Sequence, residues 1–214
     1  MDFKQTKIIL VIIAFFFSSF LLASDWELKK DKDGIAVYTR DVPNSRFKES
    51  KAEAEFNTSL STALIVIEDV ESYPKWVPDV REMKLLAKIN ANESIVYEHQ
   101  RTPLLVKDRD CILRVTGTND PLTNIATLQI TSLSDYLPRR KGIVRLEKVT
   151  ASWTFIPSTD KRTVRIIYQM HNEPGGNISP WMSNGYIVKR AFVIFTNLRK
   201  MVQSPKFLMS SKKN

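Results

Sequence analysis

The sequence predicts an α+β fold in which a curved antiparallel sheet wraps around one long C-terminal helix. Eight segments between residues 35 and 171 have the alternation or composition of strands, and short turns join most of them. The segment from 180 to about 202 instead repeats apolar residues at helical spacing. Because 214 residues without a linker or an internal repeat suit a single domain, we expect these elements to share one core.

Residues 1–23 have the form of a signal peptide and are excluded from the predicted fold. Lys4 and Lys7 make a short positive region, and 8–23 is a nearly unbroken apolar run of 16 residues. This run is somewhat shorter than the roughly 20 residues that a membrane-spanning helix needs. Ala23 offers a small residue at the cleavage site. We therefore expect an exported, periplasmic protein of a bacterium; the alternative is an anchor that is kept and holds the domain at a membrane.

The net charge indicates which partners the folded part is expected to have, and the cysteine content excludes an internal disulfide. The net charge is +9, and it falls to +8 without residues 1–23, which contain two Lys and one Asp. For an exported protein such a charge favours transient contact with anionic membrane surfaces, and we expect no nucleic acid partner. Cys111 is the single cysteine, so no internal disulfide forms. Its alternation with Leu113 and Val115 predicts a buried place on a strand.

The first elements of the folded part are a strand pair and a helix. The expected elements are an amphipathic lead-in at 26–32, strands at 35–40 and 47–56, and a helix that runs through Val70. A turn at Asp33-Gly34 precedes the first strand. Thr58 and Ser59 are suited to cap the helix, and Pro74 and Pro78 are expected to break it.

Six further strands and a long helix complete the predicted fold. The strands are expected at 81–89, 94–101, 110–118, 124–131, 143–156 and 163–171. Ser179 is expected to cap the helix, with Pro180 in its first turn, where a missing N–H costs nothing. Pro205 ends the helix, which leaves a domain at 24–204 and a basic, frayed tail at 205–214.

Five segments in order resemble the START family, the steroidogenic-acute-regulatory-related lipid transfer domains. They are Asp33–Arg40, Asp69–Trp76, Pro103–Asp110, Lys141–Arg145 and Pro174–Trp181. The resemblance covers the chain from Trp26 to about Val202. It implies a helix-grip fold with an internal apolar cavity and one bound sterol, phospholipid or similar lipid. It also implies that the loop at 132–142 gates the cavity together with the C-terminal helix.

The residues of that loop fit a gate that touches a membrane. Tyr136 and Leu137 are apolar and are followed at once by Arg139, Arg140 and Lys141. An apolar tip beside cations suits docking on an anionic bilayer. The alternative is an ordinary solvated basic loop.

Several side chains are candidates to contact the ligand, each with a structural alternative. Arg109 and Asp110 either bind a lipid headgroup or form an ion pair that fastens a strand to a loop. Glu98 either faces the cavity, as an acidic residue does in some relatives, or lies on a solvated face. The remaining candidates are Trp153 and Tyr168 on the long strands, and Ile187, Phe195 and Leu198 on the helix stripe.

We therefore expect a monomeric carrier that binds one lipid, transfers it between membranes, and uses no cofactor, metal or catalytic residue. The chain has only two histidines and contains no His-Glu-x-x-His, paired-cysteine or Gly-x-Ser-x-Gly pattern. Two alternatives stay open. One is an enzyme of the cyclase or hydrolase kind that acts on an apolar molecule through Glu98 or Asp110, and the other is a membrane-held interaction module.

Overall fold

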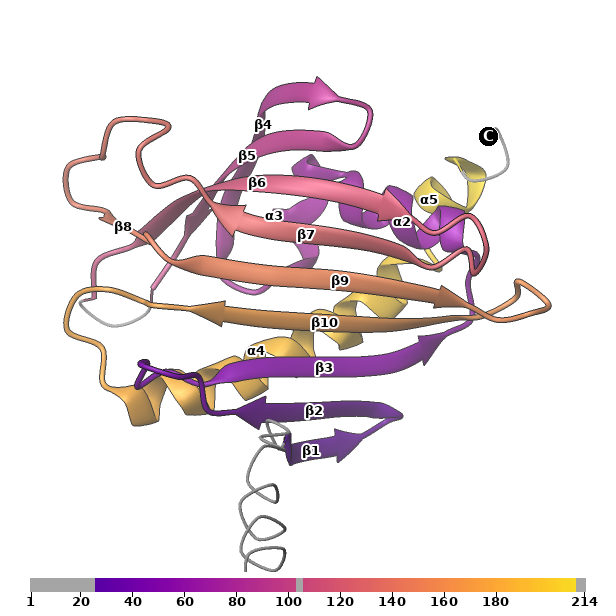
Figure 1. Cartoon of the computed structure of the whole chain (residues 1–214), viewed down its shortest axis with the longest axis horizontal. Helices are drawn as coiled ribbons and strands as arrows, with labels where there is room; N and C mark the ends of the chain where they lie inside the picture. The colour runs from indigo at the N-terminus through magenta and orange to yellow at the C-terminus, as the bar shows by residue number, and fades with distance from the viewer. Residues whose placement is uncertain (1–25, 103–105, 211–214) are drawn as a thin grey trace, which may run out of the picture.

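A ten-stranded sheet and one long helix form the body of the protein (Figure 1). The computed structural model describes residues 26–102 and 106–210, so the predicted signal peptide at 1–23 lies outside the described residues. The strand order is β1-β2-β3-β10-β9-β7-β6-β5-β4, and each of these neighbours is antiparallel. Strand β8 lies off this path and pairs in parallel with β6. The predicted α+β helix-grip fold is confirmed.

The elements follow the predicted order closely. The strands are β1 (Glu27–Lys32), β2 (Ile35–Arg40), β3 (Glu49–Phe56), β4 (Val80–Asn90), β5 (Glu93–Gln100), β6 (Arg109–Asn119), β7 (Ala126–Ser132), β8 (Val144–Arg145), β9 (Val149–Pro157) and β10 (Val164–Asn172). The helices are α2 (Leu60–Glu68), the 3₁₀ turn η1 (Val70–Ser72), α3 (Tyr73–Trp76), α4 (Pro180–Met201) and α5 (Pro205–Ser210).

Helix α4 packs on one face of the sheet, together with α2 and α3 (Figure 1). Alternate residues of β2, β3 and β10 are buried, because a strand turns every second side chain toward the same face. The C-terminal half of α4 meets this face with its apolar stripe. There Phe195 packs against Phe56 and Trp153, with ring centroids 5.6 and 6.1 Å apart. This core fixes the helix at one end and leaves its other end to form the site.

Several local predictions differ from the structure. The expected lead-in at 26–32 is β1, an edge strand paired with β2. Pro74 lies in the first turn of α3 rather than breaking a helix, because proline is tolerated in the first helical turn. The strand expected at 143–156 is split into β8 and β9, because Arg145 turns toward Asp110 and takes residues 144–145 onto β6.

The helix ends also differ in part from the prediction. Ser59 caps α2 as expected, since its Oγ accepts a hydrogen bond from the N–H of Thr62 at 3.1 Å. Ser179 precedes α4 but makes no capping hydrogen bond with its side chain. Residues 205–210 are not frayed but form α5, whose Phe207 is only 1% exposed and joins the core. No helix within 26–102 and 106–210 is long and apolar enough to cross a membrane.

Candidate functional site

Two adjoining cavities lie between the sheet and helix α4. The larger has a volume of about 430 Å³ and is lined mainly by apolar side chains from β4, β5, β6, β7 and β9. The smaller has a volume of about 310 Å³ and lies between β10, the start of β6 and the N-terminal half of α4. Both volumes fall in the range of about 300–1,000 Å³ that is typical of small-molecule sites.

The two cavities share one wall. Five residues line both of them: Gln100, Leu146, Tyr168, Met170 and Arg190. From this wall the larger cavity extends to Leu85 and Lys88 near the β4–β5 turn, and the smaller extends to Met182 on α4. The geometry therefore suits one elongated ligand that passes the shared wall.

A polar cluster stands at the shared wall. Arg190 projects from α4, and its Nη2 lies 3.8 Å from Oε1 of Glu98 on β5. Its Nη1 donates to the sulfur of Met170 at 3.7 Å, and the hydroxyl of Tyr168 donates to the same sulfur at 3.0 Å. Burial opposes the charge of Arg190, but Tyr168, Glu98 and Tyr186 outweigh it and raise the pKa of the guanidinium. A charged group therefore persists at the wall between two mostly apolar cavities.

The predicted ligand residues divide between the cavities and the core. Glu98 and Trp153 line the larger cavity, Tyr168 lines both, and Ile187 lines the smaller one. Phe195 and Leu198 are fully buried, and neither is part of the lining of the two cavities in the described residues. The stripe on α4 was thus placed on the correct face, but its C-terminal part fills the core.

Arg109 and Asp110 are not paired with each other, because neighbouring residues on β6 point to opposite faces. Arg109 lines the smaller cavity, but backbone carbonyls and Thr102 occupy its guanidinium. It donates to the carbonyls of Pro174, Gly175 and Lys107 at 3.3, 3.2 and 2.5 Å, and to Oγ1 of Thr102 at 3.3 Å. Arg109 thus holds the chain before α4 to the start of β6.

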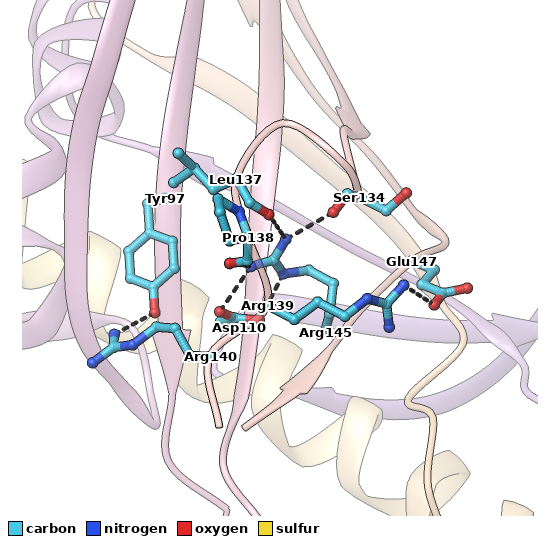
Figure 2. Close-up of polar contacts among 9 residues, drawn as sticks. All are labelled: Tyr97, Asp110, Ser134, Leu137, Pro138, Arg139, Arg140, Arg145 and Glu147. Carbon is cyan, nitrogen blue, oxygen red and sulfur yellow. Dashed lines mark hydrogen bonds and ion pairs between the residues drawn. The ribbon is translucent and has the colours of Figure 1, made fainter. Parts of the chain in front are cut away.

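Asp110 lies on the other face of the sheet, in a buried ion pair with Arg145 (Figure 2). The Nε and Nη2 of Arg145 donate to the two carboxylate oxygens at 2.7 and 3.1 Å. Arg145 also donates to the carbonyls of Ser134, Leu137 and Pro138 at 2.7, 3.1 and 3.3 Å. Of the two predicted roles, the geometry of Asp110 agrees with the structural one. The catalytic alternative named Asp110 and Glu98, so it rests on Glu98 alone.

The predicted gate, residues 132–142, lies against the face of β5 and β6 that points away from the cavities. Leu137 is half-buried against Tyr97 and its neighbours Ile95 and Ile112, so it is not the exposed tip that we expected. The hydroxyl of Tyr97 accepts a hydrogen bond from Arg140 at 2.7 Å (Figure 2). No residue of this segment lines either cavity in the described part of the chain. The gate prediction therefore gains no support from this geometry.

The exposed side chains of that segment keep their predicted character. Tyr136 is 47% exposed, Lys141 is exposed, and Arg139 is exposed and pairs with Glu147 at 2.6 Å. These residues present an aromatic ring beside cations on the surface. Membrane contact by this segment stays a prediction.

Arg190 is a residue that lines both cavities and that the sequence analysis missed. It lies three residues after Ile187 and four before Ile194, so it occupies the same helical face as these two cavity residues. A cation inside an apolar stripe is the signal that could have identified it. The described residues contain no cluster of three or more His, Cys, Asp and Glu side chains that could hold a metal ion.

Comparison with known proteins agrees with this architecture. The solved structure of a STAR-related lipid transfer protein from Xanthomonas axonopodis aligns with a TM-score of 0.77 and 32% identity, over 84% of this chain and 99% of the other. An uncharacterized protein of Pseudomonas aeruginosa is 30% identical over 182 residues, which are 85% of this chain and 89% of that protein. The phosphatidylcholine transfer protein of Rattus norvegicus is 23% identical over 169 residues, 77% of each chain.

The family model named START domain matches residues 22–206, which include every strand and the long helix. This match agrees with the resemblance of the five sequence segments. It also agrees with the fold and the cavities described above. The chain belongs to the START domain family.

Proposed function

We propose that this protein binds one lipid, or a similar apolar ligand, in the two adjoining cavities and carries it between membranes without catalysing a reaction. The observation that carries the proposal is the pair of apolar cavities between the sheet and α4. Each Å² of apolar ligand surface removed from water contributes about 25 cal/mol, before the costs of ordering the ligand are subtracted. An elongated apolar tail is the ligand shape that makes most use of this space.

The names of relatives support the same function. The similar Xanthomonas axonopodis structure is called a STAR-related lipid transfer protein, and the rat relative is called a phosphatidylcholine transfer protein. The chain matches nearly the whole of the first and most of the second. The names of these relatives and the cavities of this chain together support a lipid transfer function for it.

The first turns of α4 support contact with a membrane beside the smaller cavity. Trp181, Met182 and Tyr186 are 77%, 55% and 41% exposed, and the last two also line the cavity. Tryptophan and tyrosine favour the boundary between lipid and water, since their rings are apolar and their edges are polar. A lipid that leaves a bilayer here would enter the cavity directly.

Two surfaces are therefore candidates for membrane contact, and a lipid transfer assay with variants of each surface separates them. We expect Trp181→Ala with Met182→Ala to slow lipid transfer between anionic vesicles. Tyr136→Ala with Lys141→Ala tests the predicted docking segment in the same assay. Slowing by the second pair alone would assign the contact to 132–142 and contradict the role of α4.

We further propose that residues 1–23 are a signal peptide and that the mature protein is periplasmic. The apolar run and the preceding lysines support this proposal. N-terminal sequencing of the protein from its own cells is expected to find a start at Ser24 or Asp25. A start at Met1 would instead favour the membrane-held alternative.

Lipid analysis tests the carrier function directly. The full chain, stripped of lipid and then incubated with vesicles of bacterial lipids, is expected to recover one bound lipid by native mass spectrometry. Recovery of no lipid would contradict the proposal.

A cavity-filling variant shows where that lipid binds. Ala151→Phe places a ring in the larger cavity, so it should reduce lipid recovery severalfold. Thr150→Phe, on the exposed side of the same strand, is the matched control and should keep full recovery. Equal recovery by the two variants would place the bound lipid outside the larger cavity.

A further inference from the structure

Among the described residues, three arginines are almost fully buried, and their surroundings differ. Arg145 donates to both oxygens of Asp110 and to three carbonyls, and Arg109 donates to three carbonyls and a hydroxyl. Since a guanidinium has five N–H donors, both side chains are well satisfied by the protein. Arg190, which is 9% exposed, is the one of the three that lines both cavities. Its neighbours are side chains, namely Glu98, Met170, Tyr168 and Tyr186, and not backbone carbonyls.

The contacts of Arg190 are weak for a buried charge. Its carboxylate neighbour, Glu98, lies 3.8 Å away, which is beyond hydrogen-bonding distance. The same carboxylate oxygen already accepts a hydrogen bond from Gln100 at 2.6 Å. Nη1 of Arg190 points at the sulfur of Met170, and a thioether is a poor acceptor. The hydroxyls of Tyr168 and Tyr186 are its oxygen partners, one hydrogen bond each. Since a guanidinium has five N–H donors, Arg190 still has donors left for a ligand in the cavity.

The charges along the two cavities give the ligand a direction. The charged residues that line the smaller cavity are Arg101, Arg109 and Arg190, and no Asp or Glu is among its described lining residues. The lining of the larger cavity is mostly apolar and contains charges of both signs, which are those of Glu68, Lys88, Glu98 and Arg190. An anionic head is favoured at the shared wall and in the smaller cavity, and an apolar tail in the larger one.

We propose that Arg190 is the binding site for the anionic group of the ligand, a phosphate or a carboxylate, while the tail fills the larger cavity. This inference rests on the proposed lipid-binding function and specifies its ligand class. A guanidinium binds either anion through two parallel N–H···O hydrogen bonds, and such bonds are strong where water is excluded. Glu98 opposes the anion by like charge, so the Glu98–Arg190 contact sets the affinity rather than the fold.

Three ligands with the same tail test the anion site: dodecanoate, dodecyl phosphate and dodecanol. Binding to the full chain is measured by isothermal titration calorimetry at constant ionic strength. We expect at least one of the two anions to bind about tenfold or more tightly than the alcohol, the size of effect typical of hydrogen bonds to charged groups. Preference for dodecyl phosphate identifies a phosphate ester as the natural head, and preference for dodecanoate identifies a fatty acid.

Two variants are expected to change this preference in opposite directions. Arg190→Gln should bring the anions and the alcohol to similar affinity, while Glu98→Gln should raise the affinity for the anions severalfold. Ile187→Ala, one turn from Arg190 on α4, is the matched control and should weaken all three ligands without changing their order. If Arg190→Gln fails to fold, Glu98→Gln alone still decides, since a purely structural pair would give no gain in anion affinity.

The outcomes separate this inference from the proposed function. Binding of all three ligands with equal affinity, or an unchanged preference in Arg190→Gln, would overturn the anion site and leave lipid binding intact. Binding of none of them, together with no lipid recovered from vesicles, would instead overturn lipid binding itself.

Discussion

The Asp110–Arg145 pair shows how two buried charges are tolerated in this fold. Each side chain is 1% exposed, and water cannot solvate either one. Two hydrogen bonds from Arg145 to the carboxylate of Asp110 replace part of that solvation. Three more hydrogen bonds, to the carbonyls of Ser134, Leu137 and Pro138, replace the rest for the guanidinium (Figure 2). Because the same guanidinium binds a carboxylate of β6 and three carbonyls of one loop, a single residue joins the loop to the sheet.

Replacing Arg145 should lower the free energy of unfolding far more than replacing an exposed arginine of the neighbouring loop. Arg145→Met leaves Asp110 as a buried charge without its partner, and we expect a loss of about 3–5 kcal/mol in the free energy of unfolding. Arg139→Met breaks the exposed pair with Glu147 and should cost about 0–1 kcal/mol. Urea unfolding of both variants measures the difference, and similar losses would contradict the role given to Arg145.

Cys111 is expected to be unreactive in the folded protein. Burial raises the pKa of its thiol, and the nearby carboxylates of Glu98 and Asp110 raise the pKa further. Since the thiolate is the reactive form, a thiol reagent such as Ellman's reagent should not label the native protein at pH 8 within minutes. One thiol should react once the chain is unfolded in guanidinium chloride. Rapid labelling of native protein would show that the larger cavity opens to the reagent.

At the scale of elements, α4 has two halves with different roles. Its C-terminal half packs Phe195 and Leu198 into the core. Its N-terminal half carries Ile187 and Arg190 along the cavities. One helix thus anchors the fold at one end and forms a wall of the site at the other. Variants in the C-terminal half should change stability, and variants in the N-terminal half should change ligand binding.

Helix α5 should stabilise the domain, although its sequence is that of a basic tail. Phe207 is buried in the core, and Lys206 pairs with Asp69 before η1. We expect Phe207→Ala to cost about 3–5 kcal/mol in thermal or urea unfolding, as is typical when a buried aromatic ring is removed. Leu208→Ala, at a position that is 39% exposed, is the control and should change stability by about 0.5 kcal/mol or less. Equal effects would show that α5 is not docked.

At the scale of the whole molecule, two carboxylates link stability to pH. The N–H of Thr102, with Arg81 and His99, lowers the pKa of Asp108 despite partial burial. Burial raises the pKa of Asp69, but hydrogen bonds from Lys206 and Ser72 outweigh it, and the net shift is downward. Both groups have lower pKa values in the folded than in the unfolded state. Their stabilisation is therefore complete above the unfolded pKa of about 3.9 and is lost as pH falls through the folded values.

Acid titration of the fold tests this linkage. We expect the free energy of unfolding, from urea melts between pH 7 and pH 3, to fall below about pH 4. Asp108→Asn and Asp69→Asn should each be less stable than wild type at pH 7 and should lose less stability on acidification. Curves parallel to that of the wild type would contradict the pKa shifts.

The sequence predicted the elements well where the pattern is local. Alternation in β2 and β10 and the helical stripe of α4 come from the geometry of each element, so the residues themselves show them. Errors arose where a distant partner decides the local structure. Residues 143–148 have the sequence pattern of a strand. Arg145 nevertheless binds Asp110, 35 residues earlier in the chain, and this contact interrupts the predicted strand.

The candidate site was predictable in outline but not in its charges. Trp153, Tyr168 and Ile187 were expected at a cavity, and they line one. Arg109 and Asp110 were treated as one pair, although the alternation of a strand separates them onto two faces. Arg190 was overlooked, because whether a cation in an apolar stripe is exposed or buried depends on what packs against the helix.

By itself, the sequence determined the order of strands and helices and the family, because these depend on periodicity, breakers and short motifs along the chain. Only the tertiary structure decided where the space for a ligand lies and which charges face it. Cavities are what remains after distant side chains have packed, and the partner of each buried arginine is chosen by the same packing. That is why Arg145 and Arg109 are satisfied by the protein, while Arg190 faces the cavities.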